Sequence, residues 1–362
     1  MRSKTKKRKG NKARISKTFL VTGASGFLGY HVCKYLVNKK QRVIGVDIHD
    51  FEYDDLKDKV EFYKGDIRNK ELMNKLMKGV DVVVHSAAAL PLWKRKQIFS
   101  VNVYGTKVVL ETAFNNNVER VVYISSTSVY GIPKHHPVNE DSKLVGVGPY
   151  GESKIMAEKL CLEYRKKGFC VPILRPKTFV GEQRLGIFYF LFEWAREGRN
   201  FPWIGSGNNK YQLLDADDLA EAIWLASIKP CELANDTFNV GATEFTTVKQ
   251  DFGAVLKYAG YGKRIIGVPA WLVIPVLKLL NLFNLTPIYP WVYETSYIDH
   301  YVDVSKIQKK LGWKPKKSTA QALVDSYKWY EKHWQEYKNK RKGVTHRTPW
   351  KEGVLKIVKW FF

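Results

Sequence analysis

Two residues that could transfer a proton, Tyr150 and Lys154, stand four positions apart in the segment PYGESK. Pro149 suits the first turn of a helix, and on a helix this spacing places both side chains on one face. A tyrosine with an ordinary pKa of about 10 is a poor base at neutral pH, but a neighbouring ammonium lowers that pKa. Ser126, in the run SSTSVYG, could hold a substrate oxygen beside the phenol. We therefore expect acid–base chemistry on a hydroxyl group, although such a pair is also common on surface helices.

A glycine-rich segment, TGASGFLG, contains Gly23, Gly26 and Gly29 and lies between an apolar run and a helical stretch. Such a trio permits a tight turn, close approach of a pyrophosphate and close helix–strand packing. The pyrophosphate would then sit on the amides at the start of the helix. This pattern predicts a dinucleotide site, and the positive nicotinamide ring of a dinucleotide would also help to ionise Tyr150. An ordinary strand–helix turn is the alternative.

A carboxylate at Asp47 ends the next apolar run, eighteen residues after Gly29. In a dinucleotide site, a carboxylate here accepts hydrogen bonds from the adenosine ribose and repels a 2′-phosphate. NAD is therefore favoured over NADP as the cofactor. The alternative for Asp47 is a turn residue at the end of a strand.

Short runs that are apolar on both faces alternate with helical stretches, which is typical of a parallel sheet covered on both sides. Strands are expected at 18–22, 42–47, 60–64, 81–86, 120–126 and 171–175, with a late strand at 236–240. Helices are expected near 27–38, 69–78, 96–116 and 150–167. Right-handed crossovers then give an α/β fold, a doubly wound Rossmann sheet with a smaller C-terminal substrate-binding domain.

The pattern divides the chain into four segments. These are a basic flexible tail at 1–17, an NAD-binding Rossmann domain at 18–180, a mostly substrate-binding domain at 181–335, and a basic amphipathic tail at 336–362. The strand at 236–240 would return to the sheet of the first domain.

The net charge of +25 is concentrated at the two ends of the chain. Residues 1–17 hold nine Lys and Arg and no acid, and residues 338–362 hold eight against the single acid Glu352. Such tails are either solvated or in contact with an anionic membrane surface. Nucleic acid is not expected as a partner, because no recognition motif accompanies the charge.

Cysteine usage and the N-terminal sequence indicate a cytoplasmic protein, and the basic tails leave open a peripheral position on the inner face of a membrane. The four cysteines are scattered, which favours reduced thiols, and the first strand is not preceded by a signal peptide. No metal site is expected, and the pair His135–His136 is interpreted as part of a solvated loop. The cysteines are Cys33, Cys161, Cys170 and Cys231.

Two apolar segments lie outside the sheet pattern. Residues 265–293 are the most apolar stretch, but prolines interrupt it before it reaches the roughly 20 residues of a spanning helix. Two interpretations are open and can both hold: the segment forms a helix that lines an apolar substrate pocket, or a helix that lies in a membrane interface. Residues 353–362 form a short cationic amphipath, or else a segment docked on the body.

In combination, these motifs resemble the extended short-chain dehydrogenase/reductase family over roughly residues 18–335. The segments that carry the resemblance are TGASGFLG, Asp47, Gly65-Asp66-Ile67, His85-Ser86-Ala87-Ala88, Asn102 in NVYGT, SSTSVYG, YGESK and Leu174-Arg175-Pro176. The family implies that Tyr150 is the acid/base, that Lys154 binds the nicotinamide ribose and tunes Tyr150, and that Ser126 orients the substrate oxygen. Ser125 or Thr127 is the alternative to Ser126.

The resemblance also implies a cofactor-binding set: Gly23, Ser25, Gly26, Phe27, Leu28, Gly29, Asp47, Asp66, Ile67, Ala87, Asn102, Tyr150, Lys154 and Pro176. Within it, Asp66 and Ile67 would flank the adenine. A homodimer through the helices near 96–116 and 150–167 is implied as well.

The substrate class stays open between two branches of this family. In many nucleotide-sugar epimerases and dehydratases, a GDGxQxRDF stretch supplies an arginine to the diphosphate. The ungapped match here places Tyr211 at that position, and Lys210 or Arg184 could substitute for the arginine. The apolar 265–293 segment and the basic tails favour the other branch, which oxidises the 3β-hydroxyl of steroids and sterol carboxylates. We therefore expect a lipid-like alcohol as substrate, with a nucleotide sugar as the alternative. Thr127, Thr178 and Tyr211 are the candidate substrate-binding residues.

Overall fold

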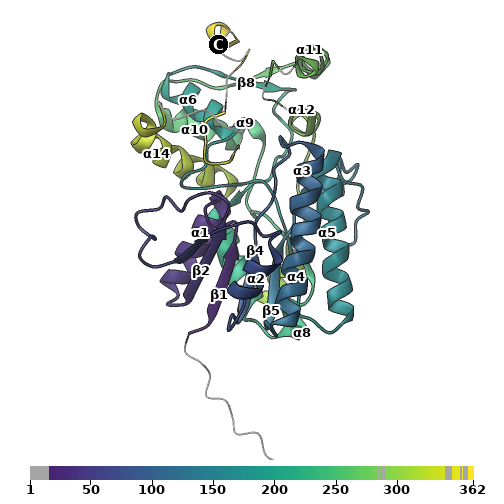
Figure 1. Cartoon of the computed structure of the whole chain (residues 1–362). Coiled ribbons are helices and arrows are strands. Elements are labelled where there is room, and N and C mark those ends of the chain that lie inside the picture. Colours follow the sequence, from purple (N-terminus) through teal and green to yellow (C-terminus); the bar gives the residue numbers. More distant parts are fainter. Residues whose placement is uncertain are drawn as a thin grey trace, which may run out of the picture.

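Seven parallel strands form the central sheet of the computed structural model, which describes residues 16–283, 285–286, 288, 290–338, 345–350, 353 and 358–362. The strand order is β10-β6-β5-β4-β1-β2-β3, the doubly wound arrangement expected from the sequence (Figure 1). The strands are β1 Thr18–Thr22, β2 Arg42–Asp47, β3 Glu61–Lys64, β4 Val82–His85, β5 Arg120–Ile124, β6 Ile173–Pro176 and β10 Thr237–Val240. The predicted return of 236–240 to this sheet is confirmed.

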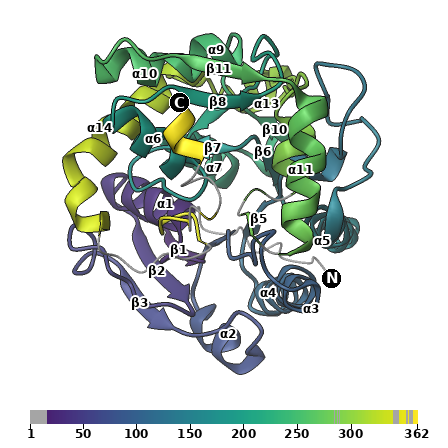
Figure 2. The ribbon, with the colours of Figure 1, turned by 90° about the horizontal axis from the view of Figure 1, so that it is seen from above.

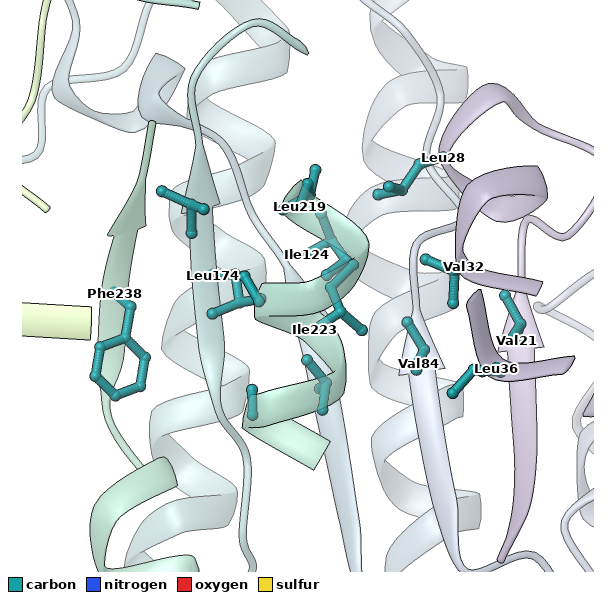
Figure 3. Packing of buried hydrophobic residues seen from close by; sticks show 14 of the residues in the cluster. Val21, Leu28, Val32, Leu36, Val84, Ile124, Leu174, Leu219, Ile223 and Phe238 are labelled. Carbon is teal, nitrogen blue, oxygen red and sulfur yellow. The ribbon is translucent and has the colours of Figure 1, made fainter. Parts of the chain in front are cut away.

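Helices cover both faces of the sheet, because the strands are apolar on both sides. On one face, α1 (Phe27–Asn38) and α7 (Ala216–Ile228) pack on β1, β4, β5 and β6. Figure 3 shows side chains of this layer, with Val32 and Leu36 of α1 and Ile223 of α7 directed into the core. The helices α2 (Lys70–Leu76), α4 (Thr106–Asn115) and α5 (Gly148–Lys166) cover the other face.

The helix expected at 96–116 is divided into three parts. A helix α3 (Arg95–Phe99) passes into a π-helical turn at Ser100–Gly105, and α4 follows. The turn contains Asn102, whose side chain is buried and bonds to Ala89 and Ser153. A wider turn here presents that amide to the loop after β4.

The smaller domain has a core of its own, built largely from aromatic side chains between α6, α10 and α14. It holds two short strand pairs, β7 with β9 and β8 with β11. The strands are β7 Phe179–Val180, β8 Phe201–Ile204, β9 Leu214–Asp215 and β11 Ile265–Val268. Its helices are α6 Phe188–Arg196, α9 Val248–Asp251, α10 Gly253–Ala259, α11 Ala270–Leu282, α12 Pro290–Thr295 and α14 Thr319–Lys338. Two other helices, α8 Cys231–Ala234 and α13 Ser305–Leu311, lie against the Rossmann domain.

The apolar stretch at 265–293 becomes β11, α11 and the start of α12. Among the residues that the structure describes, none of the helices combines the length and the apolar character needed to cross a bilayer. In Figure 2, α11 lies along the edge of the small domain, above α5.

The C-terminal region is partly docked on the small domain. Residues 345–350 bond to the loop before α6, where the amide of Leu185 donates to the carbonyl of His346 at 2.8 Å. A short 3₁₀ turn at Lys359–Phe361 (η3) follows, beside α6. The expected tail at 336–362 therefore begins as the end of α14 and then packs on the body where it is described. The basic segment 1–15 and four residues of the amphipath, 354–357, lie outside the described residues.

Candidate active site

Tyr150 and Lys154 lie on the first two turns of α5, and Ser126 follows β5 as the N-cap of the 3₁₀ turn Thr127–Tyr130. The hydroxyl of Ser126 lies close enough to the phenol of Tyr150 to lower the pKa of that phenol. Lys154 is buried; its Nζ donates to the carbonyl oxygen of Ile124 at 2.8 Å and lies 5.9 Å from the centre of the Tyr150 ring. The structure thus brings the three predicted catalytic residues together at the carboxyl end of β5.

The electrostatics of the pair are dominated by burial. Burial raises the pKa of Tyr150 to about 12, and the nearby Ser126 hydroxyl opposes that rise. Burial also lowers the pKa of Lys154 to about 8, against the opposing attraction of Glu158. The lowered phenol pKa expected from the lysine is therefore not found in the chain alone, because the apolar surroundings disfavour the phenolate more strongly than the nearby groups stabilise it.

The two alternatives to Ser126 are placed differently. Ser125 is buried and donates to Glu158 at 2.5 Å, and Glu158 in turn pairs with Arg175. Thr127 lines the same cavity as Ser126. All three residues line the cavity, but the hydroxyl of Ser125 is already bonded to the buried Glu158–Arg175 pair.

The glycine-rich loop connects β1 to α1. Gly23 has φ +72°, and a Cβ there would lie 2.8 Å from the backbone of Ala87, so only glycine fits the turn. Helix α1 begins after Gly26 with neither a side-chain cap nor an acidic residue in its first turn. An uncapped helix start with close backbone access is what a pyrophosphate requires, and this loop therefore fits a dinucleotide.

The other predicted cofactor residues stand at the carboxyl ends of neighbouring strands. Asp47 ends β2, and its carboxylate accepts from the amides of Ser25 at 3.1 Å and His49 at 2.9 Å. Asp66 follows β3 and forms a bidentate pair with Arg68, which lowers the pKa of Asp66. These contacts fix the loop, and ribose or adenine contacts by Asp47, Asp66 and Ile67 stay predictions.

Three further cofactor candidates also have defined places. The Ala87 amide donates to Thr22 at 3.2 Å beside the glycine loop. The amide of Asn102 bonds to both backbone groups of Ala89, which indicates that it positions the loop after β4. Pro176 ends β6 and lines the cavity described next.

A cavity of about 630 Å³ extends from Ser126 and Tyr150 into the small domain. Most of its lining is apolar, supplied by α6, β8 and the inner side of α11. The predicted residues Thr127, Thr178 and Tyr211 all reach it. Tyr211 is partly buried and stacks on His300, with ring centres 5.6 Å apart. This tyrosine, which stands at the position of the family's diphosphate-binding arginine, is therefore part of the cavity wall.

Lys177, His346 and Trp350 are among the cavity-wall residues that were not predicted from the sequence, whereas Arg184, which also lines the cavity, was considered as a substitute for the missing arginine. Lys177 directly follows Pro176, is buried, and bonds to the side chain and the carbonyl of His300. Burial lowers the pKa of the Lys177 ammonium well below its usual range. The only sequence signal for Lys177 was a charged residue directly after the mostly apolar run that forms β6.

Within the described part of the chain, histidines, cysteines and carboxylates do not gather in a group of three or more that could hold a metal ion. His136 packs on Tyr301 and bonds to its carbonyl oxygen at 3.1 Å. Of the pair at 135–136, His136 therefore helps to hold its loop against Tyr301.

This fold, with a glycine-rich loop at one strand end and a Ser–Tyr–Lys group at another, is typical of a Rossmann-type enzyme with a dinucleotide cofactor. A model of the NAD dependent epimerase/dehydratase family matches residues 19–241, and the chain belongs to that family. The resemblance to the extended dehydrogenases and the NAD cofactor expected from the sequence are thereby confirmed.

Similar proteins come from both substrate branches. The chain is 35% identical to the uncharacterized protein y4nG of Sinorhizobium fredii over 95% of this chain and 86% of that one. It is 27% identical to mouse sterol-4-alpha-carboxylate 3-dehydrogenase, decarboxylating, over 83% of this chain and 87% of that enzyme. The crystal structure of Thermotoga maritima UDP-glucose 4-epimerase with UDP-glucose superposes with a TM-score of 0.73 and 25% identity, covering 88% of this chain and 99% of that one.

Proposed function

We propose that this enzyme oxidises a secondary alcohol of a lipid-like substrate, such as a 3β-hydroxysteroid or a sterol carboxylate, to a ketone. The observation that carries the proposal is the apolar wall of the cavity, from Leu191 and Phe252 to Val273 on α11. A small-molecule site with extensive apolar walls and few polar groups suits a polycyclic alcohol. The similarity to the mouse sterol dehydrogenase points to the same class.

In this mechanism, Tyr150 takes the proton of the substrate hydroxyl and Ser126 donates a hydrogen bond to the oxygen as its negative charge develops. Lys154 holds the start of α5 against β5 and places its ammonium near the phenol. When bound, NAD supplies a nicotinamide ring that accepts the hydride. If the substrate carries a neighbouring carboxylate, ketone formation would also allow its loss.

The second candidate is epimerisation or dehydration of a nucleotide sugar by the same three residues. Arg184 favours it, because this buried guanidinium lines the cavity and could pair with a diphosphate. The similarity to the UDP-glucose 4-epimerase structure supports it as well. An epimerase oxidises and then reduces the sugar, so it leaves NAD unchanged overall.

We place the proposed reaction at a membrane surface. Helix α11 contributes Val273 and Leu277 to the cavity, while its outer side exposes Trp271 at 77% and Leu282 at 75%. Trp360 of η3 is 78% exposed. Both elements lie at the same end of the molecule (Figure 1), and large exposed apolar groups beside a lipid-sized cavity suit uptake of substrate from a bilayer.

We also propose a homodimer through α4 and α5. These helices lie side by side (Figure 1) and expose Phe114, Met156 and Leu162 at 40–44% each. Light scattering of the wild type and of the double variant Met156→Glu/Leu162→Glu tests this proposal. A dimer that becomes a monomer in the variant supports it, and a monomeric wild type refutes it.

The substrate proposal is tested by incubating the enzyme with NAD and two panels, sterols with a 3β-hydroxyl and UDP-sugars. Formation of NADH at 340 nm in proportion to a sterol supports it. Conversion of a UDP-sugar without net NADH, detected by chromatography, would instead establish the second candidate.

A further inference from the structure

The C-terminal segment 345–350 lies against both domains, although the family match ends at residue 241. Towards the small domain, the amide of Gly186 donates to the carbonyl of Thr348 at 3.2 Å, and Trp350 is buried. The segment is also bonded within itself, because the indole of Trp350 donates to the carbonyl of Thr345 at 3.0 Å. We call residues 345–350 the C-terminal strap.

From this strap, Arg347 reaches across to the glycine-rich loop. Its Nη1 donates to the carbonyl oxygen of Ser25 at 2.9 Å, and its guanidinium carbon lies 4.2 Å from the centre of the Tyr53 ring. Tyr53 is itself fixed to the loop, because its hydroxyl lies 3.1 Å from the carbonyl oxygens of Ser25 and Gly26. A residue 322 positions away in the chain thus touches the turn that begins α1.

A second arginine approaches the same turn from the small domain. The guanidinium carbon of Arg184 lies 5.3 Å from the ring of Phe27, the first residue of α1. Two guanidinium groups therefore stand beside a helix start that has neither a side-chain cap nor an acidic residue. The positive end of the helix and the two arginines would otherwise repel one another, and a bound anion relieves that repulsion.

We propose that the C-terminal strap is part of the NAD site and that Arg347 donates hydrogen bonds to the pyrophosphate of the bound dinucleotide. A guanidinium has five N–H donors, so the bond to Ser25 leaves donors for phosphate oxygens. Stacking on Tyr53 and the bond to Ser25 hold the group in place before the cofactor arrives, which reduces the entropy lost on binding. The strap then slows release of the cofactor as well as strengthening its binding. The proposal rests on the NAD-binding part of the assigned function and is independent of the substrate.

The test compares Arg347→Gln with Arg264→Gln in the full chain. Arg264 is an exposed arginine of the same domain whose described contacts are made by its backbone. Calorimetry measures the dissociation constants of NAD, ADP-ribose and adenosine, of which adenosine lacks the pyrophosphate. We expect R347Q to raise the dissociation constants of NAD and ADP-ribose by about tenfold each, because a charge-assisted hydrogen bond is lost. The dissociation constant of adenosine should stay unchanged. R264Q should bind all three like the wild type.

Two results would overturn the proposal. In one, R347Q binds NAD as tightly as R264Q does. In the other, R347Q loses affinity for adenosine as much as for ADP-ribose, which would show that Arg347 only stabilises the loop. Arg347→Lys keeps a positive charge for the case in which R347Q does not fold, and it should retain the preference for ADP-ribose over adenosine. Since no substrate is present, these outcomes do not depend on whether the proposed sterol oxidation is correct.

Discussion

The Nζ atom of Lys154 donates a 2.8 Å hydrogen bond to the carbonyl oxygen of Ile124, the last residue of β5. Ser126 lies only two residues beyond Ile124. The bond therefore holds the first turns of α5 against the end of β5, with Tyr150 close to Ser126. Lys154 therefore positions the phenol as well as placing a charge near it.

Replacing Tyr150 by phenylalanine removes the proposed proton acceptor and changes little else in shape. General acid–base catalysis contributes about 10²–10⁴-fold, so we expect kcat to fall by at least about a hundredfold. The dissociation constant of NAD, measured by fluorescence quenching, should stay within about twofold of the wild type. Near-normal turnover by Y150F would contradict the assignment of Tyr150 as the acid/base.

Lys154→Met should stabilise the cofactor-free enzyme while abolishing turnover. Burial lowers the pKa of Lys154 to about 8 in the folded chain, against about 10.4 in an unfolded chain. Below about pH 8 the folded protein holds a buried charged ammonium at Lys154, which lowers its free energy of unfolding. This loss of stability disappears as the pH rises from about 8 to 10.5 and the ammonium becomes neutral. K154M should therefore gain up to about 3 kcal/mol at pH 7.

Urea unfolding at pH 7 and at pH 10.5 measures this difference. The gain of K154M over the wild type should shrink at the higher pH. An equal gain at both values would indicate that the added apolar packing, and not the buried charge, is responsible.

Much of the Rossmann domain could be predicted because its signals are local. The bounds of α1 and β2 were predicted to the residue, since Gly26 and Asp47 mark a helix start and a strand end. Strand ends in a parallel sheet meet at one edge, so the order of motifs along the chain was enough to place Ser126 near Tyr150.

The cavity could not be predicted in the same way, because its wall is assembled from distant segments. Lys177, Arg184 and His346 meet there through the packing of the small domain and the C-terminal strap. The raised pKa of Tyr150 was also missed, because it results from burial of the phenol, which the Tyr–Lys spacing does not reveal. Burial can be read only from the tertiary structure.

The preference for NAD over NADP should depend on Asp47. Its carboxylate lies at the end of β2 and would repel a 2′-phosphate on the adenosine ribose. We expect the wild type to bind NADP at least about tenfold more weakly than NAD, and Asp47→Ser to narrow that ratio to within about threefold. Calorimetry with both cofactors measures the ratio, and equal affinity of the wild type for NAD and NADP would refute the role of Asp47.

The membrane proposal predicts that exposed side chains of α11 are needed for binding to lipid. Trp271 and Leu282 are both more than 70% exposed, and burying such side chains in a bilayer contributes about 1.5–3 kcal/mol each. The double variant Trp271→Ser/Leu282→Ser should therefore reduce sedimentation with anionic phosphatidylserine vesicles by at least about tenfold. Deletion of residues 338–362 would be a poorer test, because it also removes the strap that lines the cavity.

The matched control for this prediction is Leu233→Ser on α8, which lies at the opposite end of the molecule from α11 (Figure 1). Leu233 is 41% exposed, so the control removes an apolar side chain from the surface without touching the proposed contact face. It should sediment like the wild type, and the α11 variant should still oxidise a detergent-solubilised substrate. Equal sedimentation of the α11 variant and the control would remove α11 from the contact, because an apolar helix face that inserts into lipid cannot lose its two most exposed side chains without weaker binding.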